Sequence, residues 1–555
     1  MIRILFLVAC FWLLLSSCNN RNNDEVNAPK SAKGGRVYGG VFSFSVPEKP
    51  KNLFPYTSIN YYDQILSSQI YEPLFTLDSS QNVIGNLAEK YELLNDNKTF
   101  RVYLRKDILF HNGTSRFTAQ DVLFSIALAC SKFKNNNYSS LLIDKLEGAN
   151  SFFINSDVNS IHPEDFKGIK IISDYILDIK LVRPYAQFPF LLTHPNLVML
   201  SYENFKKDPS SFFKNAFGTG PFRLNEINEN NISLKRNDYY WKKDVFGNRL
   251  PFLNGITVFY NIDENKYFKE GKINMIQNVS TEKINELFGG VEEAKKGGVQ
   301  KHRLYQQKNK NLNFLLFNTN CPPFNNLLNR QFVSELINNE EICSTVLDGG
   351  GDACGHAFVP KQYFQSISSL YESQKNINKT KNNYSKAGGL NKINVFVNAA
   401  ASNWSKQWVN EASKQIEAAS GIKVSIVYGS DDDLQRLWKN GEVHLARYGW
   451  VADFLDPDSF LGIFYSSSAF AKEIGFKNSD YDQIYLSTFQ QKTKDEQLKA
   501  QFLCDQFLIN NFIVHPVFVQ DFVFVVNVNM RDFRINSSGL IDLSRVYNKP
   551  IQKIN

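Results

Sequence analysis

Residues 99–122 read TFRVYLRKDILFHNGTSRFTAQDV, the longest distinctive pattern in the chain. Its middle, His111-Asn112-Gly113-Thr114, is a turn sequence in which Gly113 is free to take a positive φ. Thr118 and Asp121 then have the spacing of a helix N-cap. The segment therefore predicts a turn followed by a helix with mostly buried positions at Val122, Phe124, Ile126 and Leu128.

Other local patterns extend this picture in both directions. Residues 41–46 (VFSFSV) alternate apolar and polar side chains, which predicts a strand with one buried face. Residues 404–419 have apolar positions at helical spacing before the stop signal Gly421, and residues 493–496 resemble a capping box ahead of another helix. The Val- and Phe-rich stretch 514–528 predicts strands. Because helices and strands alternate along the whole chain, the expected fold class is α/β or mixed α+β.

The composition is that of a large globular protein. The chain has 555 residues, 43% of them hydrophobic and 21% charged, so it can bury a substantial core. The length suggests three or four domains, or fewer large ones. The formal net charge is +7, without a dense block of Lys and Arg, so no nucleic-acid partner is expected.

The amino terminus resembles the export signal of bacterial lipoproteins. Arg3 precedes an apolar run at residues 4–15, which is shorter than the ~20 residues that cross a bilayer. Leu15-Ser16-Ser17-Cys18 is similar to a lipobox, which implies that residues 1–17 are a signal peptide and that Cys18 carries the lipid. Residues 18–36 would then be the lipid-attached cysteine and a flexible tether. The alternative is a plain secretory signal with a chance cysteine.

Five cysteines remain beyond Cys18, an odd number: Cys130, Cys321, Cys343, Cys354 and Cys504. Cys343 with Cys354 is the one candidate disulfide if the compartment is oxidising. The same pair with His356 is an alternative metal site, but no CxxC or HExxH spacing supports it. No metal and no cofactor are expected.

Several segments, taken in order, resemble one family. They are the early YEPLF at residues 71–75, the stretch 99–122, GTGPF at 218–222, KRNDYYW at 235–241, NTNCPPFN at 318–325 and GWVADFLDP at 449–457. Asn86, Asn112 and Ser115 depart from the family pattern at turn positions, where such exchanges are tolerated. The ordered set covers residues 40–547 and is similar to the extracellular solute-binding proteins of family 5. These are the oligopeptide-, dipeptide- and nickel-binding lipoproteins of ABC importers.

This resemblance implies a two-lobed, Venus-flytrap solute-binding fold with an additional inserted domain. Lobe I would take residues 37–75, 215–315 and 520–555, the extra domain residues 76–214, and lobe II residues 316–519. Two or more strands would link the lobes, so that hinge closure buries the ligand. The partners would be a peptide ligand, an ABC permease with its ATPase and, through the lipid, a membrane. We expect a monomer in the periplasm or another extracytoplasmic space, tied to a membrane surface.

Residues 447–453 (RYGWVAD) hold the candidate ligand-binding residues, Asp453, Arg447, Trp450 and Gly449. The resemblance implies that Asp453 pairs with the α-ammonium group of a peptide and that Arg447 meets its carboxylate when the length suits. Trp450 would form a pocket wall. The alternative is that Asp453 caps a local turn and Arg447 pairs with a neighbouring carboxylate.

Three further functions remain as alternatives to oligopeptide capture. Two belong to the same family, binding of a nickel chelate or of an oligosaccharide, and Asp453 argues mildly against both. The third is a secreted hydrolase, but no catalytic residues in a nucleophile–base arrangement are found, so no enzyme is expected. Asp456-Pro457-Asp458, with two carboxylates two residues apart, is expected to be an exposed turn.

Overall fold

The structure is a computed structural model that describes residues 30–550 apart from short gaps. The gaps are residues 51, 59–60, 79–81, 134–135, 137, 157–160, 186, 278, 280, 290–292, 295–300, 348–349, 371–389, 400, 402, 453–455, 492 and 537–538. The predicted signal peptide, Cys18 and tether residues 19–29 lie outside the described residues. In the part of the chain that is described, helices fall short of the length and apolar character that crossing a membrane requires.

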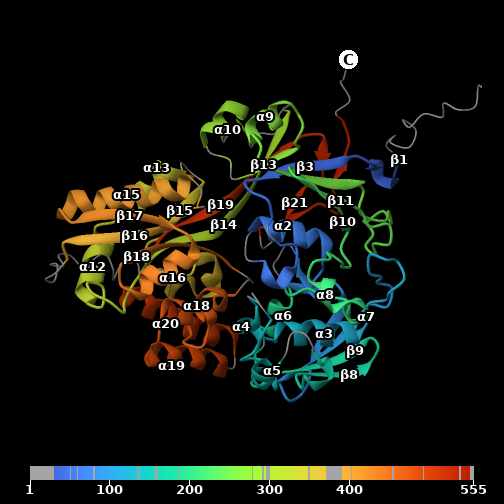
Figure 1. Cartoon of the computed structure of the whole chain (residues 1–555), viewed down its shortest axis with the longest axis horizontal. Coiled ribbons are helices and arrows are strands. Elements are labelled where there is room, and N and C mark those ends of the chain that lie inside the picture. The colour runs from blue at the N-terminus through green and yellow to red at the C-terminus, as the bar shows by residue number, and fades with distance from the viewer. Residues whose placement is uncertain are drawn as a thin grey trace, which may run out of the picture.

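One mixed sheet of eleven strands runs through the whole molecule (Figure 1). Ten strands follow the order β10-β11-β12-β3-β13-β19-β14-β18-β16-β17, and β15 pairs with β19. Their bounds in chain order are β3 (Val41–Val46), β10 (Phe222–Ile227), β11 (Asn231–Arg236), β12 (Gly255–Tyr260), β13 (Met275–Gln277), β14 (His302–Phe317), β15 (Gly351–Ala353), β16 (Lys392–Asn398), β17 (Lys423–Gly429), β18 (Leu445–Val451) and β19 (Val514–Asn527).

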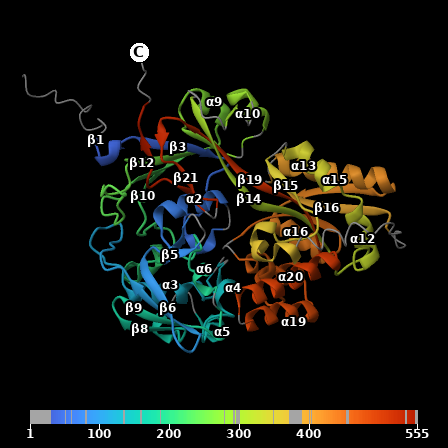
Figure 2. The ribbon, with the colours of Figure 1, turned by 180° about the vertical axis from the view of Figure 1, so that it is seen from behind.

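Two antiparallel strands, β14 and β19, carry the sheet from one lobe to the other (Figures 1 and 2). In the first lobe β19 pairs with β13, which leads to β3 and β12. In the second lobe β14 pairs with β18, which leads to β16 and β17. The prediction that strands link two lobes agrees with this topology. The predicted boundaries at 315/316 and 519/520 fall inside these two strands, and the domain limits themselves stay predictions.

The first lobe contains the segment predicted as an extra domain, which builds its own sheet in the order β6-β7-β9-β8. The four strands of this sheet are β6 (Ala88–Leu93), β7 (Thr99–Leu104), β8 (Ile169–Ser173) and β9 (Ile176–Lys180), and β4 (Phe75–Leu77) pairs separately with β5 (Val83–Gly85). The helices of this segment are α3 (Ala119–Ala129), α4 (Ser139–Leu142), α5 (Ala149–Asn155), α6 (Phe188–Leu191), α7 (Tyr202–Lys207) and α8 (Pro209–Phe212), and the lobe also holds α2 (Tyr61–Ile70), α9 (Glu264–Lys269) and α10 (Thr281–Phe288).

The second lobe covers its part of the sheet with helices on both faces. These are α12 (Leu327–Glu335), α13 (Asn339–Leu347), α15 (Asn403–Ser420), α16 (Asp431–Lys439), α17 (Asp458–Leu461), α18 (Ala469–Ile474), α19 (Ser479–Ser487) and α20 (Lys494–Asn510). The short elements of the chain are β1 (Lys30–Ser31), β2 (Val37–Tyr38), β20 (Met530–Arg531), β21 (Arg534–Ile535), β22 (Ile541–Asp542) and β23 (Tyr547–Asn548), with the 3-10 turns η2 (Lys33–Gly35), η3 (Pro55–Thr57), η5 (Pro163–Asp165), η6 (Lys361–Ile367), η7 (Gly462–Phe464) and η8 (Thr488–Gln490).

The local predictions around residues 99–122 are confirmed. Gly113 has a φ of 72° in the turn, and the side chain of Asn112 accepts hydrogen bonds from the amides of Thr114 and Ser115. Helix α3 begins after Thr118, whose amide donates to Asp121 Oδ2 over 2.8 Å. The predicted strand at 41–46, the helices at α15 and α20 and the strand at 514–528 also form.

The predicted disulfide between Cys343 and Cys354 is wrong. Both are free thiols, as are Cys130, Cys321 and Cys504. Cys343 faces the core from α13, with its Sγ atom 3.5 Å from the carbonyl oxygen of Gly351, and burial raises its pKa to about 11. Burial also raises the pKa of Cys354. Both thiols therefore act as small apolar groups of the core. Within the described residues, His, Cys, Asp and Glu side chains do not gather in threes that could hold a metal ion.

Candidate functional site

The candidate residues of the 447–453 segment lie on β18 and just after it. β18 pairs in antiparallel fashion with β14, so that Gly449 lies opposite Asn313 and Arg447 opposite Leu315. Successive side chains of a strand point to opposite faces, so Arg447 and Gly449 share one face while Tyr448 and Trp450 share the other. The strand alternation thus divides the predicted site residues into two groups.

Arg447 is a half-buried cation held by neutral groups. One terminal nitrogen of its guanidinium donates to Asn313 Oδ1 over 2.7 Å, and the guanidinium carbon lies 5.7 Å from the ring centre of Trp404. Its buried Nε atom has no hydrogen-bond partner among the described residues. Burial lowers the pKa of Arg447 to about 10, and no carboxylate among the described residues pairs with it. The alternative prediction, an ion pair with a neighbouring carboxylate, therefore finds no partner in the described part of the chain.

Gly449 lies directly beside this cation. The residue is exposed, and a Cβ atom placed on it would lie 3.3 Å from the Arg447 guanidinium and 3.3 Å from Asn311 Oδ1. Asn313 is fully buried, and its side-chain amide donates to the carbonyl oxygen of Asn311. We call Asn311, Asn313, Trp404, Arg447 and Gly449 the Arg447 cluster.

The cluster lies where the sheet passes between the lobes. Asn311 pairs with Val451, which is the first step of the β14–β18 ladder, whereas the earlier part of β14 pairs with β19 alone. Asn311, Asn313 and Trp404 were missed as site residues in the sequence. Two asparagines at alternate positions of an apolar strand, NLNFLLF at 311–317, were the one available signal.

Trp450 lies on the other face of β18. Its indole Nε1 donates to the carbonyl oxygen of Ser459 over 2.9 Å, and its ring lies 6.0 Å from that of Phe470 in α18. Its role as a pocket wall stays a prediction. Asp453, the predicted partner of a peptide ammonium group, lies outside the described residues.

A family match covers most of the chain. Residues 82–472 match the bacterial extracellular solute-binding proteins, family 5. The chain belongs to this family. Among its curated relatives, the oligopeptide-binding protein OppA of Bacillus subtilis is 20% identical over 98% of this chain and 99% of its own.

Solved structures with the two-lobed solute-binding fold cover nearly all of this family member. OppA of Haemophilus influenzae, in complex with RPPGFSPFR, has a TM-score of 0.73 at 20% identity, covering 92% of this chain and 100% of that one. The murein tripeptide binding protein MppA of Escherichia coli has a TM-score of 0.73 at 15% identity, covering 92% of this chain and 98% of MppA. The unliganded open form of MppA has a lower TM-score of 0.64, covering 93% and 99%.

Asp456 and Asp458, expected in an exposed turn, are both buried, so that prediction is wrong. Asp456 Oδ1 accepts from the amide of Asp458 and from Gln501 Nε2 over 2.6 Å. Burial, with the nearby charge of Asp458, raises the pKa of Asp456 to about 7. The Asp-Pro-Asp turn is local, but the α20 residue Gln501 and other distant residues enclose it.

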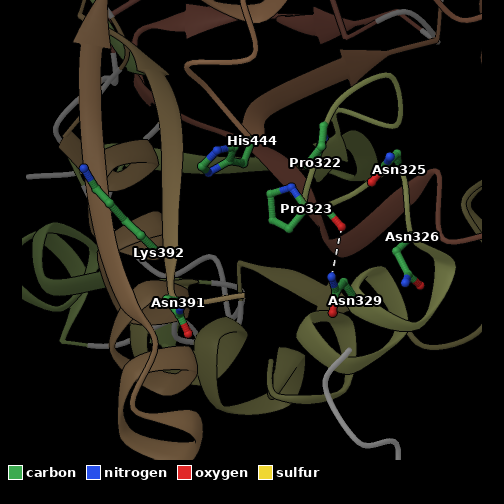
Figure 3. Close-up of a pocket in the computed structure, with 8 residues that line it drawn as sticks. All are labelled: Pro322, Pro323, Asn325, Asn326, Asn329, Asn391, Lys392 and His444. Carbon is green, nitrogen blue, oxygen red and sulfur yellow. Dashed lines mark hydrogen bonds between the residues drawn. The ribbon is translucent and has the colours of Figure 1, made fainter. Parts of the chain in front are cut away.

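A polar cavity of about 410 Å³ lies elsewhere in the second lobe (Figure 3). Lys392 opens β16 and His444 immediately precedes β18, so the cavity lies at the edge where these strands begin, whereas Gly449 is near the end of β18. The Arg447 cluster is therefore separate from it. The cavity is lined by Pro322, Pro323, Asn325, Asn326, Asn329, Asn391, Lys392 and His444.

Proposed function

We propose that this protein is the substrate-binding component of an ABC importer and that it captures oligopeptides between its two lobes. The observation that carries the proposal is Arg447, a half-buried cation beside the exposed Gly449, with one buried donor that has no partner among the described residues. A buried charge is costly unless an opposite charge or enough hydrogen bonds compensate it. A ligand carboxylate is the group that would complete this site, and bidentate pairing with arginine is the strongest form of such a bond.

A free peptide carries one negative and one positive charge, which are complementary to Arg447 and Asp453. Its carboxylate would pair with Arg447, and its α-ammonium group with Asp453, two residues beyond the end of β18. The backbone NH and CO groups are the same in every peptide, so pairing with them gives affinity without reading the sequence. The peptide bound to the Haemophilus influenzae relative supports this ligand class.

The remaining parts of the proposal concern the place of the protein in the cell. Cys18 would carry the lipid that ties the protein to a membrane from the periplasmic or extracytoplasmic side. Closure around the peptide presents the loaded form to a permease and its ATPase, and the peptide is released unchanged. This function needs no catalytic residue, metal or cofactor, and a monomer performs it.

Mass spectrometry of the purified protein under native conditions tests the ligand class. We expect intact peptides to co-purify, and a synthetic peptide mixture to be retained uncleaved. Cleaved peptides would support the hydrolase alternative. Retention of a nickel chelate or an oligosaccharide, with peptides left unbound, would replace the ligand while keeping the family.

The anchor has its own test. Cys18→Ser should release the protein from the membrane fraction, because the cysteine thiol is the site of acylation. Cys130→Ser is the matched control, since this buried thiol belongs to the folded core. Sedimentation of the Cys18 variant with membranes after a carbonate wash would contradict lipidation.

A further inference from the structure

A buried hydrogen-bonded group joins the two lobes far from β14 and β19. Tyr185 of the first lobe donates from its hydroxyl to Asp458 Oδ2 over 3.0 Å, across 273 residues of sequence. Tyr485 of α19 donates to the other oxygen of the same carboxylate, Oδ1, over 2.7 Å. All three side chains are buried, so the carboxylate is shielded from water by one tyrosine from each lobe.

Aromatic packing surrounds this group. The ring of Phe489 lies 5.2 Å from the ring of Tyr185 and 5.2 Å from that of Tyr485, edge-on to both. The guanidinium of Arg183 lies 4.7 Å from the Phe489 ring centre. Arg183 and Tyr185 of the first lobe therefore both pack against the surface formed by α17, α19 and η8, which we call the seat.

Each partner is held firmly in its own lobe. The strand-like stretch before Tyr185 is fixed by the amide of Val182, which donates to the carbonyl oxygen of Lys145 over 2.9 Å. On the other side, the backbone amide of Asp458 donates a hydrogen bond to Asp456 Oδ1, which also accepts from Gln501 of α20. Both views show α4 of the first lobe next to α19 and α20 of the second (Figures 1 and 2).

Charged side chains flank this contact on both sides. The first-lobe side carries Lys145 and Arg183, which share Asp144 at 3.1 and 3.5 Å. The second-lobe side carries Asp456 and Asp458 in the seat itself, with Asp505 and Lys494 further along α20.

We propose that Tyr185, Asp458 and Tyr485 form a latch that stabilises the closed arrangement of the lobes in the absence of a ligand. Opening separates Tyr185 from Asp458 and exposes both to water, whereas the Tyr485–Asp458 bond stays within the second lobe. The latch therefore contributes only to the closed state. The TM-score is 0.73 with one structure of MppA and 0.64 with its unliganded open form.

Such a latch has a consequence for affinity. The apparent dissociation constant of a ligand that needs the closed state is its intrinsic value divided by the fraction of closed protein. A bond that raises this fraction strengthens binding of every ligand by the same factor and slows its release. The latch therefore changes the affinity for all ligands equally and does not contribute to specificity.

Tyr185→Phe removes the bond between the lobes and keeps the ring against Phe489. Tyr485→Phe is the matched control, because it removes a hydroxyl from the same carboxylate within one lobe. For Tyr185→Phe we expect a larger radius of gyration in small-angle X-ray scattering without ligand. Dissociation of a co-purifying ligand should become on the order of tenfold faster. Tyr485→Phe should lower the melting temperature and leave the radius of gyration of the unliganded protein unchanged.

Two results would overturn the latch: an unliganded Tyr185→Phe protein with the scattering profile of the wild type, or equal expansion of both variants. The scattering measurement needs no ligand, so its outcome is independent of whether the proposed ligand class is right.

Discussion

Two charged side chains in this protein, Glu72 and Arg447, are withdrawn from water in different ways. Glu72 is buried and accepts hydrogen bonds from Tyr240, Trp241 and Thr219, with the Lys242 ammonium 3.0 Å from its Oε1 atom. In the part of the chain that the structure describes, Arg447 has one neutral hydrogen-bond acceptor, one aromatic ring and a buried Nε atom without a partner.

The difference distinguishes scaffold from site. The partners of Glu72 come from residues 219 and 240–242, so this carboxylate ties separate segments of the first lobe together. It has no capacity left for a ligand. Arg447 retains an unpaired donor beside an exposed glycine, so a ligand can complete what the protein leaves open. Both residues fall in segments that resemble the family, and only their surroundings separate the two roles.

The largest effect is expected from Glu72→Ala, which should lower the free energy of unfolding by roughly 3 kcal/mol. The variant leaves the Lys242 ammonium and the buried hydroxyls of Tyr240 and Thr219 without the carboxylate that they contact. Urea denaturation followed by circular dichroism measures the loss, and Glu89→Ala on the exposed side of β6 is the control. Peptide affinity of the folded protein should not change. A stable variant that has lost peptide binding would remove the distinction between the two charges.

Asp453→Ala should weaken binding of a free peptide by about 1.5 to 3 kcal/mol, the usual contribution of a hydrogen bond to a charged group. Isothermal titration calorimetry measures the change, and an N-acetylated peptide is the matched ligand. It should bind the wild type and the variant about equally, because it brings no ammonium group. Unchanged affinity for the free peptide would remove Asp453 as the anchor and leave Arg447 to be tested alone.

Arg447→Gln should reduce the preference for a free carboxyl terminus by about 1 to 2 kcal/mol, a value discounted for the half-exposed position. The measurement compares one peptide as acid and as carboxyl-terminal amide, in the wild type and in the variant. Lys439→Gln at the end of α16 is the control for loss of a surface charge. If the Arg447 variant keeps the preference for a free carboxyl terminus, Arg447 does not bind the ligand carboxylate and has a structural role only.

Asp456→Asn tests the smallest effect, a pH dependence. The folded pKa of Asp456, about 7, lies above the unfolded value near 4, so its contribution to stability is complete below pH 4 and is lost as the pH rises through 7. The variant should therefore gain about 1 kcal/mol over the wild type between pH 6 and pH 7. Thermal unfolding at both pH values measures this, with Asp480→Asn, an exposed position, as the control. A constant difference would mean that Asp456 stays ionised in its buried site.

Local patterns predicted much of the fold. The turn at Gly113, the start of α3 at Thr118 and the long helices α15 and α20 depend on interactions within four residues, which the sequence displays directly. Asp456 and Asp458 were placed wrongly because the tendency of Asp-Pro-Asp to turn says nothing of Tyr185 and Gln501, which arrive from distant segments. Asn313 and Trp404 were missed for the same reason.

The sequence by itself determined the family, the fold class, several of the helices and strands, and the segment that holds the candidate ligand residues. Only the tertiary structure decided that Glu72 is fully paired while Arg447 keeps a donor that is unpaired among the described residues. It also decided that Tyr185 of one lobe contacts Asp458 of the other. The reason is physical. Caps, turns and strand alternation act between near neighbours in the chain, whereas the pairing of a buried charge depends on every segment that packs around it.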